Sequence, residues 1–417
     1  MSHVGKRLRE FRKKMKLTQG ELAEGICNRS YVSQIEKGLV IPSPEILEQL
    51  AKRLDTDLKN LWSESENPSF SLVEIQNAMR HIINRIDEQE WEIARKWVLK
   101  LHGVTLPDSE KGIYYWAKGK LAEADGRIDE VEPLYLYGLE SAREQDDPVP
   151  LVRLLDSLGS FYCKHNQAQK AIRPLLEALE VVHYNAVSGL LRISVMYHLG
   201  VMHQRLGEYQ TAIEHLLYAQ ELNTTNGIMY KSGELELSLA ACFQAIGRVD
   251  DAITSIQYAI ELFQFLQNEA DVAVAHAAWG VILSDQGEFQ QAQEYFLKAI
   301  PVFAQHGRSE EANETSFHLA VLYKRMGRIS EARELCEQII LLVHPELTPK
   351  ALLLLSETAL EAEEPDTALP LLKQVLDSFG EEADKELLSH TYRLLARVHM
   401  QRHEYEEAAR LYEQSLS

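Results

Sequence analysis

The most constraining feature of this sequence is a pattern of small residues that returns about every 40 residues. Four glycines, each followed five residues later by an alanine, are Gly207, Gly247, Gly287 and Gly327. A fixed period of this length is typical of solenoids, in which each repeat packs only against its neighbours. The chain has 417 residues, too many for one compact core. The sequence therefore predicts a long stack of repeats.

Each repeat is expected to consist of two antiparallel helices. A further glycine or alanine lies seven residues before each of the four glycines, as in Gly200 and Ala240. Small residues in these slots allow two helix backbones to approach closely. The pattern continues upstream to Gly119 and downstream to Ala408, and Ala94 marks one more half-formed repeat. We therefore expect eight to nine helix pairs between residues 72 and 417.

The first 62 residues lack this pattern and carry the start and stop signals of five short helices. Thr18 and Glu21 have the spacing of a capping box. Asn28 is a favourable N-cap for a helix that ends before Gly38. Pro44 fits the first turn of a fourth helix. Apolar residues at helical spacing predict a small core of Val4, Leu8, Phe11, Leu22, Ala23, Ile26, Val32, Ile35, Leu58, Leu61 and Trp62.

The second and third of these helices have the length and spacing of a helix-turn-helix, whose second helix enters the DNA major groove. Val32 and Ile35 are expected to face the core. The outward residues of the third helix are then candidates for contacts with bases: Arg29, Ser30, Ser33 and Gln34. Candidates for contacts with phosphate are Gln19, Tyr31 and Lys37. Residues 1–62 are predicted to bind double-stranded DNA.

Charge is divided unevenly along the chain. Residues 1–62 hold 12 Lys and Arg against 8 Asp and Glu, a net charge of +4. The remaining residues hold 31 against 55, a net charge of −24, and the two sum to the −20 of the whole chain. Because DNA attracts only the basic part, the charge indicates that residues 1–62 alone meet phosphate. Residues 63–71, SESENPSFS, are polar and are interpreted as a linker.

The repeats are expected to bind a partner on the concave face that the first helix of each pair lines. That face mixes hydrogen-bonding and apolar side chains without a single sign of charge, which suits an extended peptide. Asp156 and Leu237 are expected in this lining. The candidate peptide-binding residues are Arg153, Ser157, Tyr197, His198, Gln204, Ser238, Gln244, Phe317, His318 and Lys324.

Motifs for catalysis, cofactors or metals are lacking in the sequence. It contains no glycine-rich phosphate loop, GxSxG, HExxH or CxxC. His198 and His318 are three repeats apart, too far to share a metal ion. The four cysteines are scattered singly, no signal peptide is visible, and no apolar run approaches a membrane span. We expect a cytoplasmic protein that is not an enzyme and binds no cofactor, metal or membrane.

Two stretches resemble known domain types. LTQGELAEGI-CNRSYVSQIEKG, followed by PSPEILEQLAKRL, resembles the phage-repressor (Xre/Cro) DNA-binding domain. The repeat, a small residue followed by Gly-x-Tyr/Phe-x-x-Ala, resembles the tetratricopeptide repeat, with a unit near 40 residues instead of about 34. The resemblance implies an all-α fold: a five-helix helix-turn-helix domain and a right-handed superhelix.

The combination resembles the RNPP family of regulators from Gram-positive bacteria, and most of all its NprR/PlcR branch. The resemblance implies a quorum-sensing transcription factor that binds a short signalling peptide in its concave groove. It also implies a homodimer, or a higher homo-oligomer, that binds a palindromic operator and is switched by the peptide. We expect dimer contacts in the terminal repeats, at Tyr392, Leu395, Tyr405 and Leu416.

An alternative function stays open at this point. Rap-like members of the family bind and sequester a phosphorelay response regulator. In that case the acidic repeats, together with residues 72–105, would carry the function, and DNA binding would be secondary.

Overall fold

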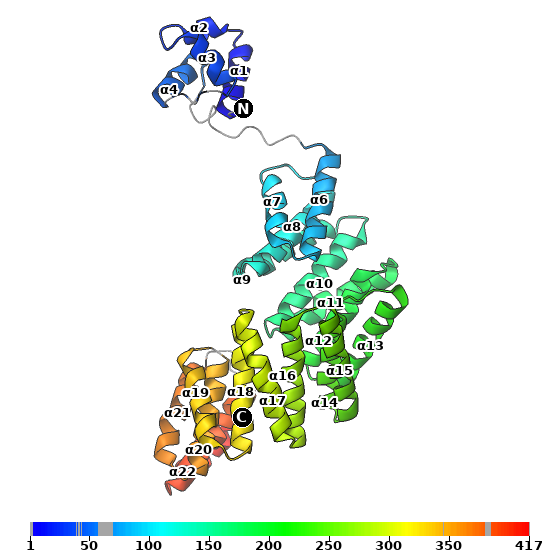
Figure 1. Ribbon diagram of the computed structural model, residues 1–417, viewed down its shortest axis with the longest axis vertical. Coiled ribbons are helices and arrows are strands. Elements are labelled where there is room, and N and C mark those ends of the chain that lie inside the picture. Colours follow the sequence, from blue (N-terminus) through cyan, green and yellow to red (C-terminus); the bar gives the residue numbers. More distant parts are fainter. Residues whose placement is uncertain are drawn as a thin grey trace. The chain divides into compact units, whose positions relative to one another are not determined.

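The computed structural model describes residues 3–38, 40, 42, 44–56, 70–344, 346–379 and 385–416. The chain forms two compact units, residues 1–145 and 146–417. In the part that the structure describes, all regular secondary structure is helical, as Figure 1 shows. The expected all-α fold is confirmed.

Four helices form the N-terminal part: α1 (His3–Lys14), α2 (Gln19–Ala23), α3 (Arg29–Glu36) and α4 (Pro44–Arg53). Leu8, Leu22, Val32 and Ile35 are fully buried between them, and Val4, Phe11 and Ile26 pack against this core. The core expected from helical spacing is therefore present. The expected fifth helix, with Leu58, Leu61 and Trp62, lies outside the described residues.

Local signals in the sequence account for the ends of these helices. The Thr18 hydroxyl accepts the Glu21 N–H at 3.2 Å, and the Thr18 N–H donates to the Glu21 carboxylate at 2.6 Å. Asn28 caps α3 by accepting the Tyr31 N–H at 2.7 Å. Gly38 has φ of 72°, a left-handed conformation that glycine adopts without strain. The predicted caps are confirmed.

Nine helix pairs follow in the described residues, the upper end of the expected number. The first helices of the pairs are α6 (Leu72–Asp87), α8 (Asp108–Ala124), α10 (Pro148–Lys164), α12 (Leu190–Arg205), α14 (Ser232–Ala245), α16 (Glu269–Gln286), α18 (Ser309–Arg325), α20 (Leu347–Glu361) and α22 (Lys385–Gln401). The second helices are α7 (Trp91–Lys100), α9 (Ile128–Ala142), α11 (Ala168–Tyr184), α13 (Tyr209–Asn226), α15 (Val249–Phe265), α17 (Phe289–Gln305), α19 (Ile329–Leu341), α21 (Pro365–Ser378) and α23 (Tyr405–Gln414).

The small-residue slots hold the closest contacts between the two helices of a pair. A Cβ atom added at Gly159 would lie 2.4 Å from Leu175 Cγ, and one added at Gly280 would lie 2.6 Å from Phe296 Cε1. These distances are shorter than van der Waals contact, so each glycine leaves room for a large side chain on the second helix. The period of the sequence is thus the period of helix packing.

The recurring glycines after the first helices reverse the chain in a left-handed conformation. Gly207, Gly247, Gly287 and Gly327 have φ between 75° and 85°. Other repeats place ordinary residues in the same turn, such as Glu363 with φ of 59° and His403 with φ of 62°. A residue with a Cβ atom is strained in this conformation, whereas glycine adopts it without that cost in free energy.

We therefore expect Glu363→Gly to raise the stability of the repeats. The gain is roughly 0.5–1 kcal/mol, because relief of the left-handed strain exceeds the entropy that glycine loses on folding. Glu337→Gly is the matched control, since Glu337 is exposed in the interior of α19, where the same change should lower stability. Thermal unfolding of both variants checks the difference, and equal effects would contradict the strain argument.

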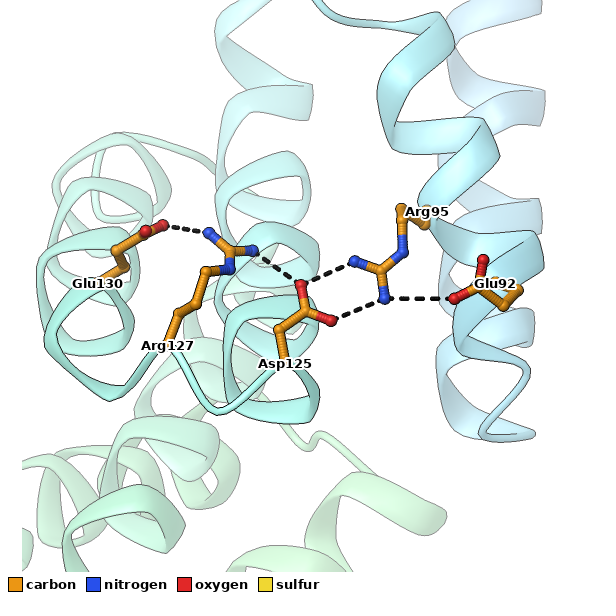
Figure 2. Close-up of polar contacts among 5 residues, drawn as sticks. All are labelled: Glu92, Arg95, Asp125, Arg127 and Glu130. Carbon is orange, nitrogen blue, oxygen red and sulfur yellow. Dashed lines mark hydrogen bonds and ion pairs between the residues drawn. The ribbon is translucent and has the colours of Figure 1, made fainter.

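An ionic network joins α7 to the turn between α8 and α9, as Figure 2 shows. Arg95 donates two hydrogen bonds to Asp125, both at 2.7 Å, and Arg127 donates a third at 3.0 Å. The hydrogen bonds from Arg95 lower the pKa of Asp125 to about 2. A carboxylate held in this way stabilises the fold while it is ionised.

Asp125→Asn is expected to lower stability near pH 7 by about 1 kcal/mol, since the pair is partly exposed. Because the folded-state pKa of Asp125 is lowered, its contribution is complete above the unfolded pKa and is lost as the pH falls through about 2. The stability difference between wild type and variant should therefore be constant at neutral pH and shrink in acid. Denaturant unfolding at a series of pH values measures this stability difference. A difference that grows in acid would contradict the assignment of a lowered pKa to Asp125.

Candidate DNA-reading helix and ligand groove

Helix α3 presents the predicted base-contacting residues on one side. Val32 and Ile35 are fully buried on its inner side. Arg29, Ser30 and Gln34 are exposed, and Ser33 is half-buried. The helix therefore has an inner face fixed by the core and an outward face of polar side chains.

The last residue of α3 is a buried carboxylate, Glu36, that sequence reasoning missed. Glu36 is 5% exposed and accepts hydrogen bonds from Arg12 Nε at 2.5 Å, Arg12 Nη2 at 3.0 Å and Gln19 Nε2 at 2.8 Å. Burial by itself raises the pKa of Glu36. The hydrogen bonds from Arg12 and Gln19 lower this pKa by a larger amount, so the net shift is downward and the carboxylate stays ionised. This cluster ties α1, α2 and α3 together and positions the outward face of α3.

The three predicted phosphate-contacting residues differ in their surroundings. Gln19 donates to Glu36 and so belongs to the buried cluster. Tyr31 is half-buried against the core of the N-terminal helices. Lys37 is exposed at the C-terminal cap of α3. Lys37 is thus the most accessible of the three side chains, and it alone of them carries a positive charge.

In the unit of residues 146–417, the first helices line one face of the stack. Each first helix from α10 to α20 contacts the first helix of the next pair. No comparable contact joins two successive second helices among the described residues. We therefore call the face of the first helices the inner face and that of the second helices the outer face.

All ten predicted peptide-binding residues lie on first helices, namely α10, α12, α14 and α18. Ser157 and His198 are buried, at 8% and 7% exposed. The half-buried members are Arg153, Tyr197, Gln204, Ser238, Gln244, Phe317, His318 and Lys324. Most of the predicted side chains are therefore partly open, and two are enclosed by packing between the first helices.

A polar cluster marks the α10 end of the inner face. Asp156, 6% exposed, accepts a hydrogen bond from the Ser194 hydroxyl at 2.6 Å and lies 2.7 Å from His198 Nδ1. Ser194 Oγ also lies 3.1 Å from the Tyr230 hydroxyl. The cluster joins α10, α12 and the loop before α14. Sequence reasoning missed Ser194 and Tyr230, although Ser194 lies one helical turn before the chosen His198.

A second polar cluster lies at the α20 end. Lys324 Nζ is 2.5 Å from Glu357 and 3.1 Å from Glu361, and His390 Nε2 is 2.7 Å from Glu357. Burial raises the pKa of Glu357, but hydrogen bonds from His390 and Lys324 lower it to about 2. Helices α14 and α18 contribute the half-buried apolar side chains of Leu237 and Phe317. Burial lowers the pKa of His318, which favours its neutral form.

The expected dimer contacts in the terminal repeats need correction. Leu395 is 4% exposed and belongs to the core of the last repeats, against which Tyr392 also packs. Tyr405 and Leu416 are exposed, at 59% and 89%. Leu395 is buried because the last helix pair packs on α20 and α21, so it is not available to a partner, whereas Tyr392 is half-buried.

Within the described part of the chain, no helix is both long and apolar enough to cross a bilayer. No group of three or more His, Cys, Asp or Glu side chains is arranged to hold a metal ion there.

Two family models match parts of the chain. Residues 8–61 match a helix-turn-helix model, and residues 347–417 match a tetratricopeptide repeat model. The chain is also similar to the transcriptional activator NprA of Geobacillus stearothermophilus. The two are 23% identical over 285 residues, which cover 67% of each chain.

Solved structures share the fold. The apo form of the quorum sensor NprR from B. thuringiensis has a TM-score of 0.64 and 16% identity, and the match covers 82% of this chain and 98% of that one. NprR in complex with its cognate peptide NprX gives a TM-score of 0.60 with 16% identity and the same coverage. A Rap protein complexed with Competence and Sporulation Factor gives 0.61 with 14% identity, covering 82% and 97%.

The two domain types, the similarity to NprA and the fold of NprR and Rap proteins agree with the resemblance seen in the sequence. In domain types and in fold, this chain is therefore similar to regulators of the RNPP family.

Proposed function

We propose that this protein is a cytoplasmic transcriptional regulator whose repeats bind a short signalling peptide on the inner face and thereby control promoter binding. The observation that carries the proposal is that one chain combines a helix with an outward polar face, α3, and an inner face of first helices that holds both polar clusters and half-buried apolar side chains. The regulators NprA and NprR support it by similarity.

On the DNA side, Arg29 and Gln34 supply side chains that can pair with a guanine and an adenine through two hydrogen bonds each. Both are exposed on α3, and neither contributes to the core. The basic charge of residues 1–62 supplies the attraction to phosphate. A homodimer would place two such helices on a palindromic operator, with half-sites about 34–36 Å apart.

On the peptide side, the inner face offers what an extended chain needs. Backbone groups of a bound peptide require donors and acceptors, which Ser238, Gln204 and Gln244 provide. Apolar side chains of the peptide would lie on Leu237 and Phe317. Gln244 donates to Asp285 at 2.8 Å and Lys324 is held by two carboxylates, so these two residues would exchange partners on binding.

The switch follows from the contacts between first helices. A peptide that touches several first helices at once favours one spacing of the stack over others. The dimer contact and the DNA-binding helices belong to the same chain. A change in the spacing of the stack therefore alters how residues 1–62 of the two copies are presented to the operator. Peptide binding is thereby linked to the dimer or oligomer state and to promoter binding.

Thermal stability and oligomeric state, measured against a panel of peptides of five to eight residues, test this function. The panel contains the C-terminal ends of small secreted open reading frames beside the gene. A cognate peptide should raise the melting temperature and change the oligomer, and Phe317→Ala should weaken its binding by at least tenfold. Ile246→Ala is the matched control, because Ile246 is 37% exposed at the cap between α14 and α15. A protein that binds an operator fragment but no peptide would contradict the peptide proposal.

A second candidate is a Rap-like adaptor that binds and sequesters a response regulator. The fold shared with a Rap protein favours it, with the acidic surface of the repeats as the binding face. The two candidates differ in what deletion of residues 1–62 does. Capture of a response regulator should survive the deletion if the protein is an adaptor, whereas control of a promoter should not survive it.

A further inference from the structure

One of the three buried carboxylates in the described part of the chain has no cationic partner. Glu36 is bonded to Arg12, and Asp156 lies 2.7 Å from His198 Nδ1. Glu236 of α14 is 7% exposed and forms no ion pair among the described residues. Burying a carboxylate without a cation costs free energy. Glu236 is therefore the buried carboxylate that lacks an opposite charge.

Neutral side chains hold Glu236 in place. The Gln220 amide of α13 donates a hydrogen bond to its carboxylate, and the Ser255 hydroxyl of α15 also stabilises it by a hydrogen bond. Burial raises the pKa of Glu236, and these two bonds offset only part of that rise. Both partners lie on second helices, so Glu236 lies on the side of α14 that is turned away from the inner face.

A hollow of about 370 Å³ lies beside Glu236. It is formed by the end of α13, the loop of residues 227–231 and the start of α14. Its lining combines the carboxylate with the apolar side chains of Leu235 and Leu262. Met229 borders it and is 50% exposed, so this side chain is free to move aside. The volume is at the lower end of those that hold small ligands.

Asn223 adds a second buried acceptor to the same lining. Its side chain is 5% exposed, and Nδ2 donates to the Tyr230 carbonyl at 2.9 Å. This bond fixes the orientation of the amide. The amide oxygen, Oδ1, has no hydrogen-bond partner among the described residues. A buried acceptor without a donor is unfavourable. The hollow therefore combines two acceptors that need a donor with an apolar wall.

We propose that this hollow binds a small aliphatic amine, whose ammonium group contacts Glu236 and Asn223 Oδ1 and whose hydrocarbon stem packs on Leu235 and Leu262. An ammonium group supplies three donors and one positive charge, which are what the two acceptors lack. A metal ion fits less well, because no group of three or more ligating side chains is arranged to hold one in the described residues.

The surroundings of the hollow leave the choice of charge to Glu236. Helix α13 ends and α14 begins there, so helix dipoles of opposite sign oppose each other. Lys231, in the loop between them, is not part of the lining, and its Nζ lies 5.1 Å from the centre of the Tyr197 ring. The site goes beyond the proposed function, because it lies outside the inner face.

Isothermal titration calorimetry of the full-length protein with n-pentylamine and n-pentanol tests the site. The two compounds share a hydrocarbon stem, and only the amine is charged at neutral pH. Wild type should bind the amine at least about tenfold more tightly than the alcohol, as expected for hydrogen bonds to a charged group. Glu236→Gln keeps the shape of the side chain and removes its charge, so it should weaken amine binding by about tenfold or more.

Glu221→Gln is the matched control, because it removes the same charge from an exposed position on α13 and should leave amine binding unchanged. The proposal is overturned if the amine binds no more tightly than the alcohol, if Glu236→Gln binds it like wild type, or if Glu221→Gln weakens binding equally. The last two results would assign the amine to the acidic surface as a whole. The comparison of amine with alcohol needs no variant, so it decides even if Glu236→Gln does not fold. Neither operator nor peptide is used, so the outcome is independent of the proposed function.

Discussion

Replacing Arg29 and Gln34 together with alanine is expected to abolish preference for the operator while leaving the fold intact. Each side chain can form a two-point contact with a base, so the double change should weaken specific binding roughly 30-fold to 10,000-fold. Both side chains are exposed and neither belongs to the core of the N-terminal helices, so the melting temperature should hold. Fluorescence anisotropy with operator and random duplexes measures the loss.

Two controls separate base reading from general attraction to DNA. Lys37→Ala should weaken binding to operator and random duplexes alike and reduce the salt dependence by about one counterion, because a phosphate contact carries no sequence information. Lys52→Ala, on the exposed side of α4, should change little. If the double variant still prefers the operator as strongly as wild type, then α3 does not read the bases.

The features that the sequence predicted well are those that depend on neighbours within one or two helical turns. The capping box of Thr18 and Glu21 and the glycine stop at Gly38 are local, so residue type and spacing suffice to find them. The helix pairs could be found because packing repeats about every 40 residues. A slot such as Gly280 must stay small because one particular partner, Phe296, fills the space.

Contacts between distant segments could not be predicted in the same way. Glu36 appears in the sequence as an ordinary charged residue at a helix end, yet 24 residues separate it from Arg12, its buried partner. Ser194 and Asp156 are 38 residues apart and meet because neighbouring first helices contact each other. The prediction of a dimer contact at Leu395 was wrong for the same reason. Periodicity finds an apolar position but does not show which neighbouring helix of the same chain covers it.

Gly5→Ala is expected to destabilise the N-terminal helices by about 3 kcal/mol, at the upper end of the usual cost of overpacking. A Cβ atom at Gly5 would lie 2.0 Å from the carbonyl oxygen of Ile35, which is backbone and cannot rotate away. That oxygen also accepts the Gly38 N–H at 2.9 Å, so moving it disturbs the end of α3. The better helix propensity of alanine, about 1 kcal/mol, does not offset this clash.

Gly20→Ala is the matched control, because the nearest atom to its added Cβ, Thr18 Oγ1, is 3.9 Å away. At Gly20 the same change should be neutral or should stabilise the N-terminal helices by up to about 1 kcal/mol. Hydrogen exchange in α1 and α3 of the full-length protein, together with operator affinity, measures both variants. Exchange should rise and affinity fall only for Gly5→Ala. Since α1 carries none of the proposed base contacts, such a result would show that operator binding depends on the close approach of α1 to α3. Equal behaviour of the two variants would mean that this approach is looser than 2.0 Å implies.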